Sequence, residues 1–247
     1  FSLGDSTFPF ASPHGGSMTM ASVGSAVHVA CRAARAKALE LAATDKQSPL
    51  RGANFNMTDA ADGRLFLRAD PSRGERYQDI LARHGLDTLE CAEMTQPGAE
   101  HNEYSMHAFG ALFAEVAVDR DFGIVRVRRL VGAYAAGRIV NPKMARSQSI
   151  GGMVRGIGMA LMEHTITDRT SGRIVNADLA NYLAPVNADI GDLDPIFVEE
   201  NDPYVNPLGA KGIGELALVG VAPAIANAVF HATGKRVRDL PITPEKL

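Results

Sequence analysis

The sequence predicts an α+β fold, and two observations support that prediction. Residues 108–134 alternate apolar and polar side chains about a turn at Gly123, as Val125 and Val127 do with the arginines that follow each of them. This period of two is typical of an antiparallel hairpin with one buried face. Helical patterns lie before and after the hairpin, without the steady strand–helix–strand rhythm of a parallel α/β protein. We therefore expect mixed sheets and hairpins with packed helices.

Turn and capping residues divide the chain into successive elements. Residues 1–17 are rich in Gly, Ser and Pro and are expected to form a loop. The elements expected after it are a helix over 19–43, a turn at Asp62-Gly63 between short strands, a short helix over 75–84, strands over 108–119 and 124–134, a helix over 143–159, a hairpin turn over 168–172 and a helix over 216–233. Ser17 or Thr19 would cap the first helix, and Gly234 would end the last one. The first helix is expected to bury one side, made of Val23, Val27, Ala30, Ala34, Ala38 and Leu41.

Composition limits the class of protein and its partners. The chain has 247 residues, 46% of them hydrophobic and 21% charged, as a globular protein does. We treat 1–247 as one region that can divide into subdomains over about 1–105 and 106–247. A formal net charge of −3 gives no reason to expect nucleic acid as a partner. The longest apolar run, 216–230, contains Gly220 and Pro223, so no membrane insertion is expected.

The cysteine and histidine residues are not spaced in the sequence as metal ligands are. Two cysteines cannot build a disulfide framework, and Cys31 lies in an Ala-rich helical stretch where a small core residue is expected. His101 and His107 are near a strand start, and the other histidines are scattered. We therefore expect no metal ligand from the protein.

Three segments place glycine or proline where a ligand could approach the backbone. Residues 14–19 (HGGSMT) lead into a helix whose free N–H groups suit an anion, although the residues alone favour a flexible loop with a helix N-cap. In 137–148 (GRIVNPKMARSQ), Asn141-Pro142 starts a helix between Arg138 and Lys143, either as a phosphate clamp or as a charged helix surface. The third segment, 151–158 (GGMVRGIG), carries helix glycines that cost about 1 kcal/mol each, which close packing against a cofactor or another helix would explain.

The sharpest pattern is 206–215 (NPLGAKGIGE), in which glycines precede an acid at the start of an apolar helix. Glycine lets the backbone approach a neighbouring group closely. Glu215 then has two interpretations that the residues alone leave open. It either complements the helix dipole or acts as a general base on a rigid element.

Together these segments resemble one family. Residues 104–134, 137–161 and 206–246, with the GxKGxGE motif and the closing HATGKRVRDLP, are similar to the molybdenum-binding subunit of the xanthine dehydrogenase/aldehyde oxidase family. The resemblance is strongest to the bacterial aldehyde oxidoreductase type, and the stretch with GGSMT near the N-terminus shares it. It implies the fold of the second molybdenum-cofactor-binding domain.

The resemblance also implies a set of site residues and partners. Glu215 corresponds to the catalytic glutamate of a hydroxylation that takes its oxygen from water. The positions that correspond to cofactor contacts are Gly15, Gly16, Ser17, Met18, Thr19, Arg138, Ile139, Val140, Asn141, Pro142, Lys143, Met144, Gln148, Lys211, Gly212, Ile213 and Gly214. The cofactor implied is molybdenum-molybdopterin in its cytosine dinucleotide form, with 2Fe-2S clusters and FAD on partner subunits or domains.

The family subunit is much longer than this chain, so either a second chain supplies its first cofactor domain or this chain alone binds no cofactor. The expected partners are the remaining half of the molybdenum-binding subunit, an iron–sulfur subunit, an FAD subunit and a small aldehyde or heteroaromatic substrate. The chain alone is expected to be inactive. A non-catalytic assembly or scaffold fragment is the alternative, and the sequence leaves the substrate and a cytoplasmic or periplasmic location open.

Overall fold

The computed structural model describes residues 5–8 and 14–247, which form two units. One unit comprises 22–97, and the other comprises 98–247 together with the N-terminal residues up to 21. The sequence suggested a single boundary near residue 105, whereas the structure divides the chain after residues 21 and 97. Both units mix helices with small sheets, which confirms the α+β prediction.

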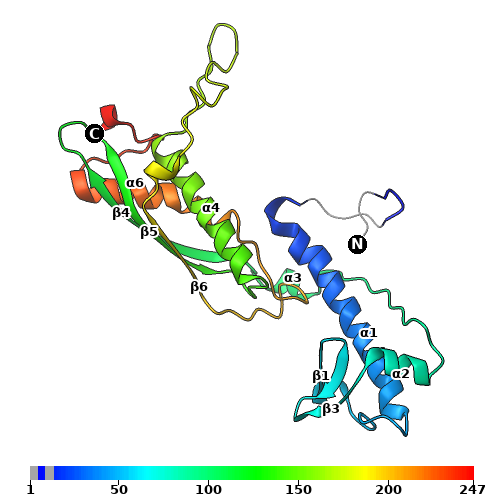
Figure 1. Cartoon of the computed structure of the whole chain (residues 1–247). Coiled ribbons are helices and arrows are strands. Elements are labelled where there is room, and N and C mark those ends of the chain that lie inside the picture. The colour runs from blue at the N-terminus through cyan, green and yellow to red at the C-terminus, as the bar shows by residue number, and fades with distance from the viewer. Residues whose placement is uncertain (1–4, 9–13) are drawn as a thin grey trace. The chain divides into compact units, whose positions relative to one another are not determined.

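The unit over 22–97 packs a helix pair against a three-stranded antiparallel sheet (Figure 1). Its elements are α1 (Ser25–Thr44), β1 (Thr58–Ala61), β2 (Arg64–Leu67), β3 (Asp70–Arg76) and α2 (Tyr77–Arg83). Asp62 and Gly63 have φ of 50° and 72° and join β1 to β2, as expected of a two-residue hairpin turn. The core comprises Ala38, Leu39, Ala42, Leu50, Leu65, Leu67 and Ile80.

The first helix differs from its prediction in where it is buried. It starts through a π-helical turn, Met20–Gly24, and its buried residues lie mainly in the second half, at Ala38, Leu39 and Ala42. Val23 and Val27 are 45% and 56% exposed, so the expected apolar side is wrong for the first half of the helix. Cys31 is also exposed rather than a core residue.

The other unit is built on a mixed sheet with the strand order β4-β5-β6 (Figure 1). The predicted hairpin is confirmed as β4 (Phe109–Val118) and β5 (Val125–Ala135), with Gly123 in the turn at φ 67°. A third strand that the sequence did not reveal, β6 (Asp192–Phe197), pairs with β5 in parallel. Pro195 lies within β6, and proline is typical of sheet edges because it lacks an N–H group.

Two long helices cover one face of this sheet. α4 (Pro142–Leu161) confirms the helix predicted over 143–159, and the final predicted helix is broken at Gly220 into α5 (Leu216–Val219) and α6 (Val221–Thr233). Gly234 has φ 75° and ends α6, as predicted. Their shared core comprises Val127, Leu130, Tyr134, Met153, Ile157, Ala160, Ala217, Val221, Ala222, Ile225, Val229 and Ile242.

The remaining elements are short. They are α3 (Glu100–Glu103) and the 3₁₀ turns Gly15–Ser17, Phe55–Met57, Asn187–Asp189 and Pro244–Lys246. The predicted turn over 168–172 is present between the bridged residues Thr167 and Ile174. The segment Leu216–Thr233 is long and apolar enough to cross a membrane by length and composition alone. Val221, Ile225 and Val229 from this segment are fully buried, so the segment serves here as a core helix. Core helices meet the same criteria of length and composition as membrane-spanning helices.

Tyr134 is a polar residue at the centre of this core. Its side chain is 1% exposed, and its hydroxyl oxygen has no hydrogen-bond partner among the described residues. Burial raises the pKa of this hydroxyl to about 12. The folded protein therefore keeps its full stability with respect to this group below pH 10, and it loses that stability as pH rises towards 12. Tyr134→Phe should therefore raise the free energy of unfolding by about 1 kcal/mol at pH 7, and by more above pH 10. Urea unfolding at both pH values checks this, and a loss of stability in Tyr134→Phe would show that the hydroxyl has a partner.

Candidate cofactor site

The segment 206–215 is a loop that ends at the start of α5, and side-chain hydrogen bonds shape it. The amide of Asn206 donates to the carbonyl of Ala210 over 2.8 Å, and its carbonyl accepts from the N–H of Leu208 over 3.1 Å. Gly209, at φ 72°, occupies the left-handed region that other residues avoid. The loop therefore has a fixed backbone conformation.

The end of β5 pairs with this loop. Gly137 and Ala210 form an isolated antiparallel bridge, the N–H of Arg138 donates to the carbonyl of Gly209 over 2.7 Å, and the N–H of Lys211 donates to Ala136 over 3.0 Å. The predicted segment 137–148 thus begins directly beside the loop over 206–215.

Lys211 does not project into open space. Its ammonium contacts Glu200 Oε1 at 2.6 Å and Asp202 Oδ2 at 2.9 Å, and it donates to the carbonyl of His107 over 3.1 Å. Burial lowers the pKa of Lys211, but the hydrogen bonds and charges of the two carboxylates outweigh burial and leave the pKa raised. Burial likewise raises the pKa of Asp202, but the hydrogen bonds from Lys211 and from the N–H groups of Tyr204 and Val205, with the charge of Lys211, together outweigh burial and leave the pKa lowered. The predicted contact Lys211 is therefore the centre of an ion-pair cluster.

The sequence did not reveal Glu200 and Asp202. Glu200 also accepts a hydrogen bond from the N–H of Gly137 over 2.6 Å, so one carboxylate joins the end of β5 to the loop. Both acids follow a strand that itself went unrecognised, and surface loops are commonly acidic. Only the long-range pairing of β5 with β6 brings them to Lys211.

The N-terminal segment 14–19 lies against the same loop. A Cβ atom at Gly212 would lie 3.3 Å from Ser17 Oγ and 3.4 Å from the carbonyl oxygen of Gly16. Gly16 and Ser17 have φ of 67° and 63°, an unusual conformation for serine, and His14 Nδ1 lies 2.7 Å from Thr19 Oγ1. Thr19 therefore bonds to His14 at the start of the helix. The predicted segment 14–19 contacts the loop over 206–215 through Gly16 and Ser17.

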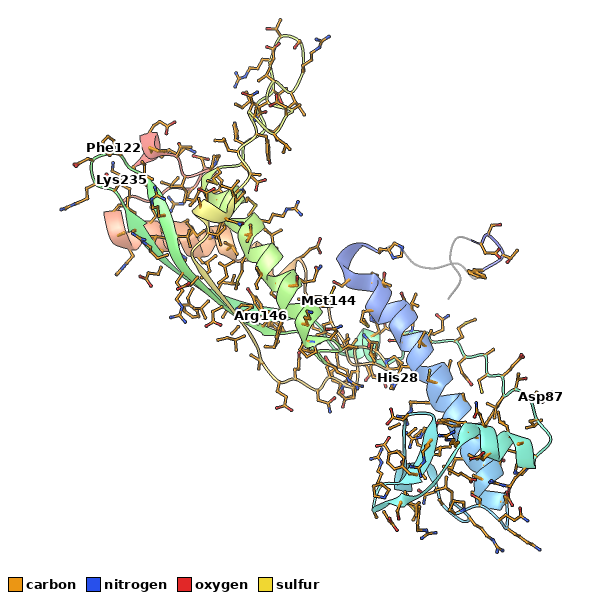
Figure 2. All side chains as sticks on the ribbon, in the orientation of Figure 1. His28, Asp87, Phe122, Met144, Arg146 and Lys235 are labelled. Carbon is orange, nitrogen blue, oxygen red and sulfur yellow. The ribbon has the colours of Figure 1, made fainter. Side chains whose placement is uncertain are left out.

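Helix α4 contributes its first turns and a glycine face. Asn141 caps it by accepting from the N–H of Met144 over 3.1 Å. The side chains around the cap are exposed at Arg138, Val140, Pro142, Lys143 and Met144 and half-buried at Ile139. Met144 and Arg146 lie on the first turns of α4 (Figure 2). Gln148, also exposed, has its Oε1 2.9 Å from where a Cβ at Gly214 would lie.

Two glycines of 151–158, Gly152 and Gly156, serve helix packing. A Cβ at Gly152 would lie 3.0 Å from the carbonyl oxygen of Gly214, and one at Gly156 would lie 2.8 Å from both methyl carbons of Val221. The sequence left two explanations for these glycines, packing against a cofactor or against another helix. The contacts with Gly214 and Val221 support packing against another helix. That contact also sets where Gly214 and Glu215 lie relative to α4.

This packing gives a matched pair of substitutions. Gly156→Ala should lower the free energy of unfolding by about 2 kcal/mol, because the added methyl overlaps Val221. Gly151→Ala should raise it by about 1 kcal/mol, since no atom lies within 4 Å of the added carbon and alanine favours helix. Thermal unfolding of both variants checks the pair, and equal effects would contradict the packing.

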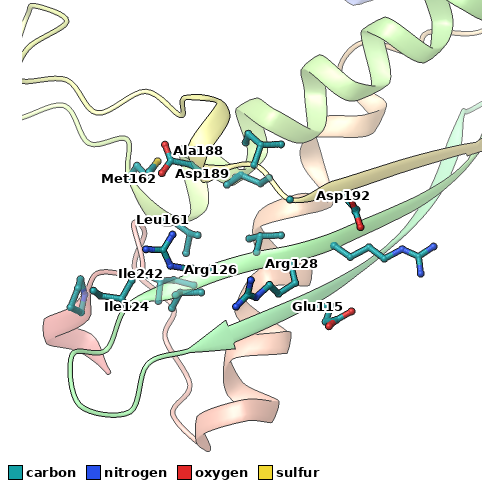
Figure 3. A pocket seen from close by; sticks show the side chains of 17 residues that line it. Glu115, Ile124, Arg126, Arg128, Leu161, Met162, Ala188, Asp189, Asp192 and Ile242 are labelled. Carbon is teal, nitrogen blue, oxygen red and sulfur yellow. The ribbon is translucent and has the colours of Figure 1, made fainter.

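Glu215 stands at the N-terminal end of α5, and its side chain is exposed. The larger cavity, about 620 Å³, lies elsewhere, between β5 and the end of α4, and includes Arg126, Arg128 and Asp192 (Figure 3). The second, about 550 Å³, lies between β4 and α6. Neither is lined by Glu215, whose side chain is exposed to solvent within the described residues.

The predicted site residues thus meet on one stretch of backbone. Segments 14–19, 137–148 and 151–158 all contact residues 209–217, and these contacts lie within one unit. The backbone N–H groups of Gly212, Ile213 and Gly214 have no hydrogen-bond partner within the described part of the chain. In that part no cluster of three or more His, Cys, Asp or Glu side chains could hold a metal ion.

Known proteins share this sequence and fold. The aldehyde oxidoreductase molybdenum-binding subunit PaoC of Escherichia coli is 41% identical over 245 residues, which are 99% of this chain and 31% of that protein. The xanthine dehydrogenase molybdenum-binding subunit of another Escherichia coli strain is 41% identical over 140 residues, 57% of this chain and 18% of that protein. The chain therefore spans about a third of the length of PaoC.

A solved structure supports the fold alone. CO dehydrogenase from Oligotropha carboxidovorans superposes with a TM-score of 0.77 at 22% identity, over 97% of this chain and 30% of that one. The family model of the molybdopterin cofactor-binding domain matches residues 3–191, before the loop that carries Lys211 and Glu215. The chain therefore belongs to the molybdopterin cofactor-binding domain family, whose relatives here are molybdenum-binding subunits of aldehyde oxidoreductase and xanthine dehydrogenase.

Proposed function

We propose that this chain supplies one side of a molybdenum-cofactor site, and the catalytic base, of an oxidoreductase that hydroxylates an aldehyde or an N-heterocycle with oxygen from water. One observation carries the proposal: three separate segments meet residues 209–217, directly before Glu215. The PaoC relative is a subunit of an aldehyde oxidoreductase, which favours the aldehyde as substrate class.

The residues present fit an oxygen-rich, anionic cofactor. Unpaired N–H groups at Gly212, Ile213 and Gly214 are donors without a protein acceptor, and a run of such groups suits anionic oxygens. Gln148 offers an amide that both donates and accepts beside Gly214. The remaining predicted contacts of 15–19 and 138–144 lie on the segments that border this stretch.

When bound, the cofactor supplies the two-electron redox chemistry, and the protein positions groups and moves protons. The Glu215 carboxylate accepts a proton at Oε from the water-derived nucleophile, and its ionised form has acceptors only. Lys211 is engaged by Glu200 and Asp202, so its role here is to hold the loop rather than to bind phosphate. Iron–sulfur and FAD partners would supply the path by which the electrons leave.

The cytosine dinucleotide form is part of the proposal. Arg138 and Lys143 are exposed on either side of the Asn141 cap, and both can pair with a pyrophosphate. Acid hydrolysis of the purified, assembled enzyme should release cytidine monophosphate in proportion to its molybdenum. Molybdenum without any nucleotide would contradict this form of the cofactor.

The origin of the product oxygen tests the reaction itself. The assembled enzyme, turned over in H₂¹⁸O with an aldehyde, should place ¹⁸O in the carboxylic acid product, as mass spectrometry would show. The controls are the product with enzyme and the aldehyde without enzyme, each in H₂¹⁸O, because an aldehyde also exchanges its carbonyl oxygen with water through its hydrate. Label from ¹⁸O₂ instead of water would overturn the proposed reaction.

One observation favours the second candidate, a non-catalytic assembly fragment. Glu215 is exposed within the described residues, and neither of the two cavities described above includes it. Under the first proposal, the missing two-thirds of the relatives' length would close the site over it. The Glu215→Gln variant discussed below separates the two candidates.

A further inference from the structure

The β4-β5-β6 sheet has one face covered by its own helices. Leu112, Leu130 and Tyr134 project from this face into the core shared with α4 and α6. Both helices belong to that one core, and they also pack against each other. The sheet and its helices thus make two layers.

The opposite face carries an apolar surface, which we name the outer patch. The strand register places Ala111 beside Ala133, and Ala133 beside Ile196, so the three side chains share this face. The outer patch comprises Phe109, Ala111, Phe113, Val131, Ala133, Ala135 and Ile196. Phe109 is 64% exposed, Phe113 is 68% exposed and Ile196 is 47% exposed. A neighbouring group of exposed aromatic and aliphatic side chains marks an interaction surface.

A row of charges ends the outer patch. Glu115 pairs in register with Arg129, and Arg129 with Asp192, on the same face. Arg129 also forms an ion pair with Asp194 at 3.2 Å. Arg126, which pairs with Ala117, also lies on this face, so acidic and basic side chains together mark the limit of the outer patch.

The strand sequence indicates that both faces are covered in the whole protein. Over 109–114 (FGALFA), β4 is apolar on the inward and the outward side, as strands buried on both faces are. Beyond Glu115 the outward face of the hairpin also carries charge, at Arg126 beside Ala117. The chain also spans 31% of the length of its PaoC relative, so most of such a subunit lies outside it.

We propose that the outer patch docks the remainder of the molybdenum-binding subunit, which buries Phe109 and Phe113 with apolar side chains. The choice of occupant rests on the proposed function, because it takes the chain to be part of such a subunit. The patch itself rests on register and exposure alone.

Thiol labelling of the assembled enzyme tests this with a matched pair. In a Cys31→Ser, Cys91→Ser background, Phe113→Cys is compared with Phe122→Cys. Phe122 is 71% exposed but lies in the β4–β5 turn, away from the outer patch (Figure 2). In the complete subunit, maleimide should label the Phe113→Cys thiol at least about ten-fold more slowly than the Phe122→Cys thiol, because the first is covered.

The outcomes separate this proposal from the proposed function. Equal labelling rates in an enzyme that contains molybdenum and turns over overturn the docking surface and leave the function intact. Slow labelling of Phe113→Cys in a protein without molybdenum supports the surface while the function fails. Slow labelling of this chain alone, together with a dimer observed by sedimentation, would overturn the proposal. The molecule that covers the outer patch would then be a second copy of this chain.

Discussion

Glu215→Gln should lower kcat of the assembled enzyme by about a hundred-fold to ten-thousand-fold, the range that a general base contributes. Glutamine keeps the shape of the side chain but cannot accept the proton. The side chain is exposed and makes no cap to α5, so folding and molybdenum content should be unchanged. Steady-state kinetics together with metal analysis measure both quantities.

A matched control makes the result specific. Glu103→Gln makes the same exchange at an exposed carboxylate in α3 and should retain full activity. If Glu215→Gln also retained full activity with its cofactor bound, Glu215 would not be the base, and the non-catalytic interpretation of this chain would be favoured.

Lys211→Met should lower the free energy of unfolding by about 3 kcal/mol, because it leaves two partly buried carboxylates without their cation. The Lys211 side chain is 6% exposed, and those of Glu200 and Asp202 are 26% and 15% exposed. Lys143→Met, at an exposed position in α4, is the matched control and should change stability by less than about 0.5 kcal/mol. Urea unfolding at pH 7 measures both variants.

The pH dependence of the Lys211 cluster follows from the pKa shifts. The pKa of Asp202 is lowered, so its contribution is present above its unfolded pKa and is lost as pH falls through the folded one. In Lys211→Met the Asp202 carboxylate has no cation beside it. Protonation in acid then removes the repulsion between Asp202 and Glu200. The difference in unfolding free energy between wild type and Lys211→Met should therefore shrink below about pH 4. A difference that stayed constant from pH 7 to that range would contradict the ion-pair assignment.

Local signals predicted the elements whose residues are close in sequence. The Val and Arg alternation predicted β5, Asn141-Pro142 predicted the start of α4, and Gly234 predicted the end of α6. The first helix shows where this fails: a periodic apolar side was expected to be buried, but burial depends on a partner surface, and Val27 is exposed.

Long-range contacts could not be predicted from the sequence. β6 contains Pro195, which argues against a strand, and its pairing with β5 joins residues far apart in the chain. The partners of Lys211 depend on that pairing. The segments of the candidate site were marked by glycine, proline or capping patterns, but Glu200 and Asp202 were not, and the meeting of the segments at 209–217 is visible only in three dimensions.

Amide hydrogen exchange over 212–216 tests the central claim most directly, in the assembled enzyme prepared with and without its molybdenum cofactor. These N–H groups have no acceptor from the described part of the chain, so the account predicts slow exchange with the cofactor bound and fast exchange without it. The same rapid exchange in both preparations, with the cofactor present by metal analysis in one of them, would contradict it.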